Sequence, residues 1–76
     1  MPAHNKKIAR RIREIRSFDL TQKQFAHLLN VSQATVSKLE KGLLLPNSEI
    51  LLKLSEISDR SVDWILKGEE QNKTGT

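Results

Sequence analysis

The segment from Gln33 to Lys38 carries side chains suited to contact the edges of nucleic-acid bases. Gln can bond adenine at N6 and N7, Lys can reach O6 and N7 of guanine, and Ala can meet the thymine methyl group. A helix here would turn Val36 and Leu39 toward a core. The opposite face then holds four small or polar residues, Gln33, Ala34, Ser37 and Lys38. Because a helix face in water more often carries Glu and Lys, this pattern favours contact with base edges.

Two short helices are predicted to position that face. Thr21 and Ser32 are typical N-cap residues, whereas Asn30 and Gly42 tolerate the left-handed conformation that ends a helix. Only three or four residues join the two helices, so they must cross steeply. Ala26 lies where a larger side chain would hold them apart.

The whole chain reads as helical, since no period-2 alternation is long enough for a strand. Further helices are expected at about 5–17, from 46–48 onward, and at 62–67, which gives an all-α fold of five helices. The apolar spacing predicts the inward residues to be Ile8, Ile12, Ile15, Phe25, Leu28, Leu29, Val36, Leu39, Ile50, Leu51, Leu54 and Ile57. We therefore expect one domain over 1–68 and a disordered polar tail over 69–76.

The composition narrows the class of protein. The 76 residues leave room for one small domain, and the lack of cysteine excludes disulfides and thiolate catalysis. The longest apolar run is 43–45, too short to span a membrane, and the basic N-terminus lacks the apolar stretch of a signal peptide. We expect a cytoplasmic protein, either bacterial and associated with the nucleoid or encoded by a phage.

The positive charge is concentrated in the first half of the chain. The net charge is +4, yet residues 1–16 hold six cations against Glu14 alone, while 42–76 hold four cations and six anions. Such asymmetry is typical of a domain that meets a polyanion on one side. The alternative is a solvated helix face that keeps the protein in solution.

The pattern of residues over 21–42 resembles the helix-turn-helix of the Cro/C1-type phage repressor family. The matching residues are Thr21-Gln22, Phe25-Ala26, Leu29-Asn30-Val31-Ser32-Gln33, Val36-Ser37, Leu39-Glu40 and Gly42. The likeness extends through Pro46 to 62–69, so it covers about residues 8–69. It implies a five-helix, lambda-repressor-like domain whose third helix enters the major groove of double-stranded DNA, usually as a homodimer. Because the contact between copies would be small, a dimer that assembles only on DNA is an alternative.

The resemblance also assigns roles to individual residues. The base-reading set would be Gln33, Ala34, Thr35, Ser37 and Lys38. The phosphate-contacting set would be Gln22, Lys23, Ser32, Lys41 and Arg10. Arg16 and Glu40 match positions that form a partly buried ion pair, which here would tie the first helix to the end of the third.

Three features depart from the family pattern. The link between Arg16 and Thr21 is one residue shorter than usual, and Asn30 replaces the usual turn glycine. The loop after the third helix is apolar, Leu43-Leu44-Leu45, where the family commonly has polar residues. Leu44 and Leu45 are predicted to form a dimer contact with Trp64 of the fifth helix. Alternatively, two of the leucines pack beneath the fourth helix and one is simply exposed.

An enzyme is not expected from the remaining residues. Ser17, Ser32 and Ser37 have no base and orienting partner, so nucleophilic catalysis lacks support. The acids Glu49, Glu56, Asp59 and Asp63 do not converge as in a nuclease metal site. His4 and His27 share no helical face with a carboxylate cluster, so we expect neither a metal nor another cofactor.

The expected function is that of a sequence-specific regulator of transcription, most simply a prophage-type repressor that binds a palindromic operator as a dimer. Two alternatives within DNA binding are an autoregulatory antitoxin and a restriction-modification controller. A third is a module that bridges proteins without reading DNA. The small, polar outer face of the third helix argues against the bridging module, because a protein-docking helix would carry apolar anchors there.

Overall fold

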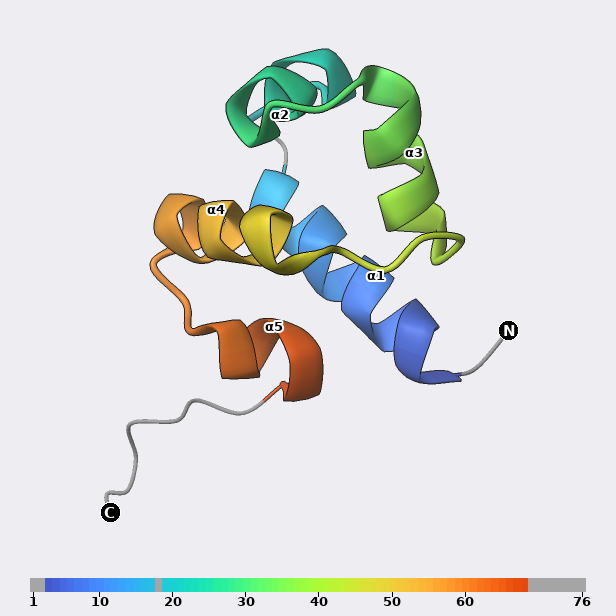
Figure 1. Cartoon of the computed structure of the whole chain (residues 1–76), viewed down its shortest axis with the longest axis vertical. Coiled ribbons are helices and arrows are strands. Elements are labelled where there is room, and N and C mark those ends of the chain that lie inside the picture. Colours follow the sequence, from blue (N-terminus) through green and yellow to red (C-terminus); the bar gives the residue numbers. More distant parts are fainter. Residues whose placement is uncertain (1–2, 18, 69–76) are drawn as a thin grey trace.

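The computed structural model describes residues 3–17 and 19–68, and within them the chain forms five helices and no strand (Figure 1). The helices are α1 (Ala3–Arg16), α2 (Gln22–Leu29), α3 (Gln33–Lys41), α4 (Ser48–Ser58) and α5 (Val62–Lys67). The all-α architecture is as predicted, and α1 begins and ends slightly earlier than expected. The predicted tail over 69–76 lies outside the described residues. No described helix has the length and apolar character needed to cross a membrane.

Thr21 and Ser32 cap their helices as predicted, and α4 and α5 begin in the same way. The N-caps are Thr21, Ser32, Asn47 and Ser61, and each accepts a hydrogen bond from a backbone N–H in the first turn of its helix. At Thr21 the cap is reciprocal, because the Gln24 side chain accepts from the Thr21 backbone N–H at 2.9 Å. These bonds satisfy donors that the helix itself leaves unpaired.

The turn between α2 and α3 depends on Asn30 in the left-handed conformation, with φ 61°. Its N–H donates to the His27 carbonyl at 3.1 Å, and the Val31 N–H donates to the Ala26 carbonyl at 3.0 Å. This paired arrangement closes the C-terminus of α2 within one residue and sends the chain directly to the Ser32 cap. Asn30 therefore replaces the usual glycine without lengthening the turn.

Asn30→Ala is expected to lower the free energy of unfolding by about 1 kcal/mol, because alanine pays the steric penalty of positive φ. Asn30→Gly is the matched control and is expected to stay within about 0.5 kcal/mol of the parent, since glycine adopts this conformation freely. Urea denaturation of both variants measures the difference. Equal effects of the two substitutions would contradict this role for residue 30.

The short link between α1 and α2 is closed by a second left-handed residue, Ser17, with φ 52°. Its N–H donates to the Arg13 carbonyl at 2.9 Å, and its hydroxyl oxygen accepts from the Asp19 N–H at 3.3 Å. The Arg16 guanidinium then donates to the Leu20 carbonyl at 2.9 Å. The left-handed turn at Ser17 therefore follows directly on the end of α1 at Arg16.

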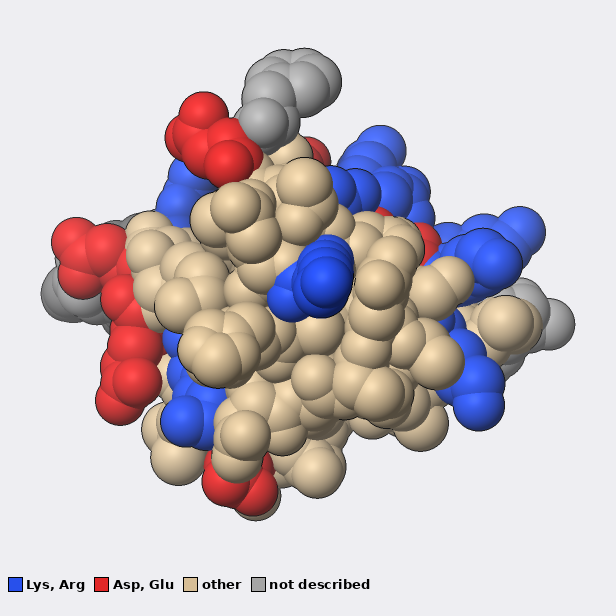
Figure 2. Space-filling model, turned by 90° about the horizontal axis from the view of Figure 1, so that it is seen from above, with Lys and Arg blue, Asp and Glu red and all other residues tan. Residues whose placement is uncertain are grey.

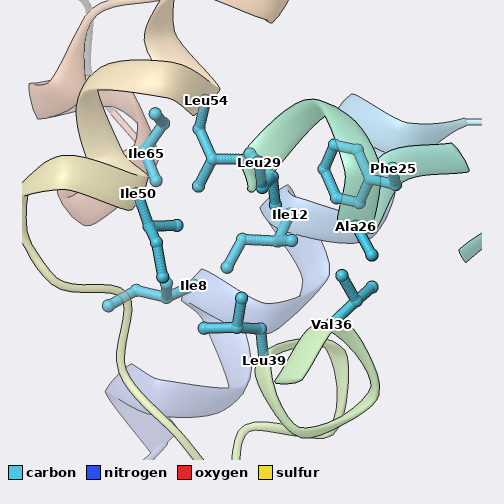
Figure 3. Packing of buried hydrophobic residues seen from close by; sticks show 10 residues of the cluster. All are labelled: Ile8, Ile12, Phe25, Ala26, Leu29, Val36, Leu39, Ile50, Leu54 and Ile65. Atoms are coloured by element: carbon cyan, nitrogen blue, oxygen red, sulfur yellow. The ribbon is translucent and has the colours of Figure 1, made fainter. Parts of the chain in front are cut away.

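The core gathers side chains from all five helices, as Figure 3 shows. Its buried members are Ile8, Ile12, Phe25, Ala26, Leu29, Val36, Leu39, Ile50, Leu54 and Ile65. Ala26 is only 4% exposed, as expected for the close approach of α2 and α3. This core fixes α3 against α1 and α2 and leaves the other side of α3 uncovered.

The prediction of burial is wrong for two of the residues expected to face inward, and two others are only partly buried. Leu28 is 47% exposed, because three residues beyond Phe25 the helix turns it about 60° to the side of the buried stripe. Ile57 shares a face with Ile50 but stands in the last turn of α4, where it is 37% exposed. Ile15 and Leu51 pack on the edge of the core.

Candidate nucleic-acid interface

Helix α3 has two sharply different faces. Its inward face consists of Val36, Leu39 and Glu40, all buried. Its outward residues are Gln33, Ala34, Lys38 and Lys41, which are exposed, together with the half-exposed Thr35 and Ser37. The structure thus brings all five predicted base-reading residues onto one helix with its outer side free of other elements of the described chain.

The start of α3 is held by its two hydroxyl residues. The Ser32 hydroxyl oxygen accepts from the Thr35 N–H at 3.1 Å, and the two side-chain oxygens lie 2.9 Å apart. Both hydroxyls therefore take part in the helix cap. Only one of their two hydrogens is used between them, so the other hydroxyl hydrogen can still donate to DNA, beside the methyl group of Thr35.

The end of α3 is anchored through Glu40, which is 5% exposed. Arg16 approaches its carboxylate with two nitrogens, Nε at 2.6 Å and Nη2 at 3.1 Å. The predicted ion pair is therefore present despite the shortened link after α1. This bidentate geometry aligns the planar guanidinium with the planar carboxylate, and the two bonds compensate the cost of burying the charge of Glu40.

Two further donors at Glu40 were not expected from the sequence. The Gln22 side-chain amide donates to Glu40 Oε1 at 3.1 Å, and Arg13 donates to the Glu40 backbone carbonyl. Together with Arg16 they connect α1, the start of α2 and the last turn of α3. A buried carboxylate needs several donors, but nothing in the residue spacing indicates which polar side chains supply them.

Gln22 thus has a structural partner in addition to the role that the resemblance implies. An amide nitrogen carries two hydrogens, so one remains available while the other bonds Glu40. The side chain is half-buried at the first position of α2, where backbone N–H groups also point outward. A phosphate bound there would be connected to the end of α3 through a single side chain.

The other predicted phosphate ligands are exposed cations around α3. Lys23 is on α2, Lys41 is in the last turn of α3 and Arg10 is on α1. Seen from above α2 and α3, Lys and Arg gather mainly at the right of the molecule and Asp and Glu mainly at the left (Figure 2). The charge asymmetry of the sequence is therefore also an asymmetry of the surface.

The apolar loop after α3 is fully on the surface. Leu43, Leu44 and Leu45 are 61%, 41% and 51% exposed, so the alternative in which two of them are buried beneath α4 is wrong. Trp64 is half-buried against the core, and the Arg60 guanidinium stacks 4.2 Å from its ring centroid.

The two parts of the predicted dimer contact lie apart within one chain. Trp64 shares a surface hollow with Ile15 near the end of α1. Gly42, directly before the leucines, lies against Asn5 near the beginning of α1. These two positions of α1 are about 15 Å apart along the helix axis.

Residues 10–65 match the helix-turn-helix family, and the chain belongs to it. Its fold is that of the Cro/C1-type DNA-binding regulators of transcription, a family of regulators rather than of enzymes. Among the described residues no group of His, Asp or Glu is arranged to hold a metal ion.

Solved structures and one curated relative are similar to the chain. The P22 c2 repressor in complex with a synthetic operator is 33% identical, with a TM-score of 0.74 over 82% of this chain and 96% of that one. The restriction-modification controller C.AhdI from Aeromonas hydrophila is 26% identical, with a TM-score of 0.73 over 84% and 98%. The transcriptional activator BcrR of Enterococcus faecalis is 42% identical over 52 residues, 68% of this chain and 26% of that protein. The chain thus spans about a quarter of the length of this relative.

Proposed function

We propose that this protein is a sequence-specific regulator of the prophage-repressor type, which binds a palindromic operator as a homodimer and represses by occluding a promoter. The observation that carries the proposal is the uncovered face of α3, held rigidly by the core on one side and by Glu40 at its end. The similarity to the P22 c2 repressor, solved on its operator, supports the same use of this helix.

In this proposal the roles divide between reading and positioning. Gln33, Ala34 and Lys38 contact base edges in the major groove, with Thr35 and Ser37 beside them. Around them, backbone phosphates are bound by Gln22, Lys23, Ser32, Lys41 and Arg10. Ser32 can contribute its backbone and its hydroxyl group, because the hydroxyl oxygen accepts the cap bond while a hydroxyl also carries a donor hydrogen.

A two-fold dimer would place two copies of α3 in successive major grooves, about 34 Å apart. We assign the contact between copies to the loop 43–45, where three consecutive leucines are exposed. Burying them would remove apolar surface from water that nothing in one chain covers. Leu44 and Leu45 are the central residues of this contact, and Trp64 of α5 completes it from the other copy, since the two parts lie apart within one chain.

The variant Leu44→Ser/Leu45→Ser is expected to bind an inverted repeat at least about tenfold more weakly, since losing the burial of even one of the four leucines in the dimer, about 1.5 kcal/mol, corresponds to that factor. Binding to an isolated half-site should stay unchanged, because the leucines contact only the second copy. Leu52→Ser, at a residue that is 60% exposed on α4, is the control for removing a surface leucine. Titration of both duplexes distinguishes the cases, and equal weakening on the half-site would reject this loop as the dimer contact.

A second regulatory setting is favoured by the comparisons. The similarity to C.AhdI favours a restriction-modification controller as the second candidate, and BcrR is an activator. A reporter with the recovered operator placed either across or upstream of a promoter distinguishes them. Repression from the overlapping site alone supports the repressor, whereas stimulation from the upstream site supports the controller or activator.

A further inference from the structure

Helix α1 carries a row of cations outside the helix-turn-helix. Lys6, Lys7, Arg10 and Arg13 line one shallow hollow of about 280 Å³, and all four side chains are exposed. Lys6, Arg10 and Arg13 follow the spacing i, i+4, i+7, so they lie on a single face of the helix. We call these four residues the α1 strip.

The α1 strip runs alongside the C-terminal half of α3. Arg13 donates to the Glu40 carbonyl at one end. At the other end, a Cβ placed on Gly42 would lie 3.5 Å from the Asn5 carbonyl oxygen. In Figure 1 the beginning of α1 and the end of α3 lie on the same side of the molecule. The strip therefore extends the cationic edge that begins with Lys41.

The strip opposes the stability of its own helix. The first turn of α1 contains no acidic residue, and cations near a helix N-terminus are disfavoured by the helix dipole. Lys6 and Arg10 are also like charges four residues apart, which repel. Glu14, four residues after Arg10, is the acid of α1 near the strip, and the ion pair that α1 makes is that of Arg16 with Glu40, so the four cations of the strip outnumber the acids beside them. Charges retained in such a position fit an external polyanion.

We infer that the α1 strip binds the phosphate backbone that flanks the segment read by α3, on the same DNA duplex. This deepens the proposed function and rests on it. Lys6 and Arg13 are about 10 Å apart along the helix axis. Duplex DNA carries one phosphate per about 3.4 Å of axis on each strand, so the strip faces about three phosphates. The strip adds affinity without adding sequence preference.

The test compares two variants that lower the net charge equally. Lys6→Ala/Arg10→Ala removes two members of the strip, and Lys53→Ala/Lys67→Ala removes two cations from α4 and α5. Binding to the selected operator and to a random duplex of equal length is measured over a range of salt concentrations. The slope of log K against log salt is negative, and each lost phosphate contact makes it less steep by about 0.9, so the slope of the strip variant should be less steep by about 1.8 on both duplexes. The control variant should keep the parent slope.

Hydroxyl-radical footprinting supplies a second readout. Protection of the backbone outside the half-site should disappear in the strip variant and persist in the control. If both variants change the slope equally and leave the footprint intact, the strip acts only through net charge and the inference is overturned. A strip-specific loss on random DNA without any preferred sequence would uphold the strip and reject the proposed function instead.

Discussion

Arg16→Ala should lower the free energy of unfolding by about 3 kcal/mol, because it leaves the Glu40 carboxylate buried with Gln22 as its remaining side-chain donor. We place the loss at the lower end of the range for buried pairs because the Arg16 side chain is 24% exposed. The substitution also frees the Leu20 carbonyl and so loosens the turn before α2. Urea denaturation measures the change.

A double variant separates the unpaired charge from the rest of the effect. Arg16→Met/Glu40→Met should be more stable than Arg16→Ala, because it removes both charges and leaves no buried carboxylate without its partner. Arg10→Ala, an exposed cation on the same helix, should change stability by less than about 0.5 kcal/mol. A loss below about 1 kcal/mol for Arg16→Ala would mean that water reaches Glu40 and that the pair does not hold α3.

Gln33→Ala should weaken binding to the selected operator by about 1–3 kcal/mol, or about 5- to 150-fold, and relax the preference at one base pair. Gln33 is exposed at the first position of α3, where its amide can bond an adenine with both groups. Its loss should leave stability unchanged, since the side chain is no part of the core. Competition binding against operators substituted at each position measures both effects.

Gln22→Ala provides the contrast. Its partner is Glu40 and its proposed ligand is a phosphate, so all sequences should be weakened alike, by about fivefold. If Gln33→Ala weakened random and operator DNA equally, α3 would not be the reading helix. If Gln22→Ala changed the base preference, the boundary drawn between reading and positioning residues would be wrong.

The local chemistry of single residues predicted most of the fold. Ser32 and Ser61 begin helices through a single side chain, and Gly42 ends one because it has no side chain, so these helix ends can be identified from the residue type alone. The ion pair of Arg16 with Glu40 is long-range and was available only from the resemblance to a family. Spacing alone would not have joined residues of two different helices.

Residues at the margin of a helix face were predicted less well. Leu28 and Ile57 fit the apolar spacing of their helices, but Leu28 lies at the edge of the buried face of α2 and Ile57 lies in the last turn of α4. Burial at such positions depends on whether another helix or loop covers them. Gln22 and Arg13 could not be predicted as partners of Glu40 for the same reason, because Gln and Arg are common on protein surfaces and their spacing does not indicate a partner. Exposure of all three leucines after α3 likewise follows from where the loop runs rather than from its composition.

The proposed role of α3, which is to read a specific sequence as part of a two-fold dimer, can be measured by selection from randomised 30-base-pair duplexes at about physiological salt and again at higher salt. We expect recovery of an inverted repeat whose half-sites are about one helical turn apart, with affinity that falls steeply as salt is raised. Absence of any enriched sequence at either salt would contradict this role and would direct attention to a protein partner for the outer face of α3.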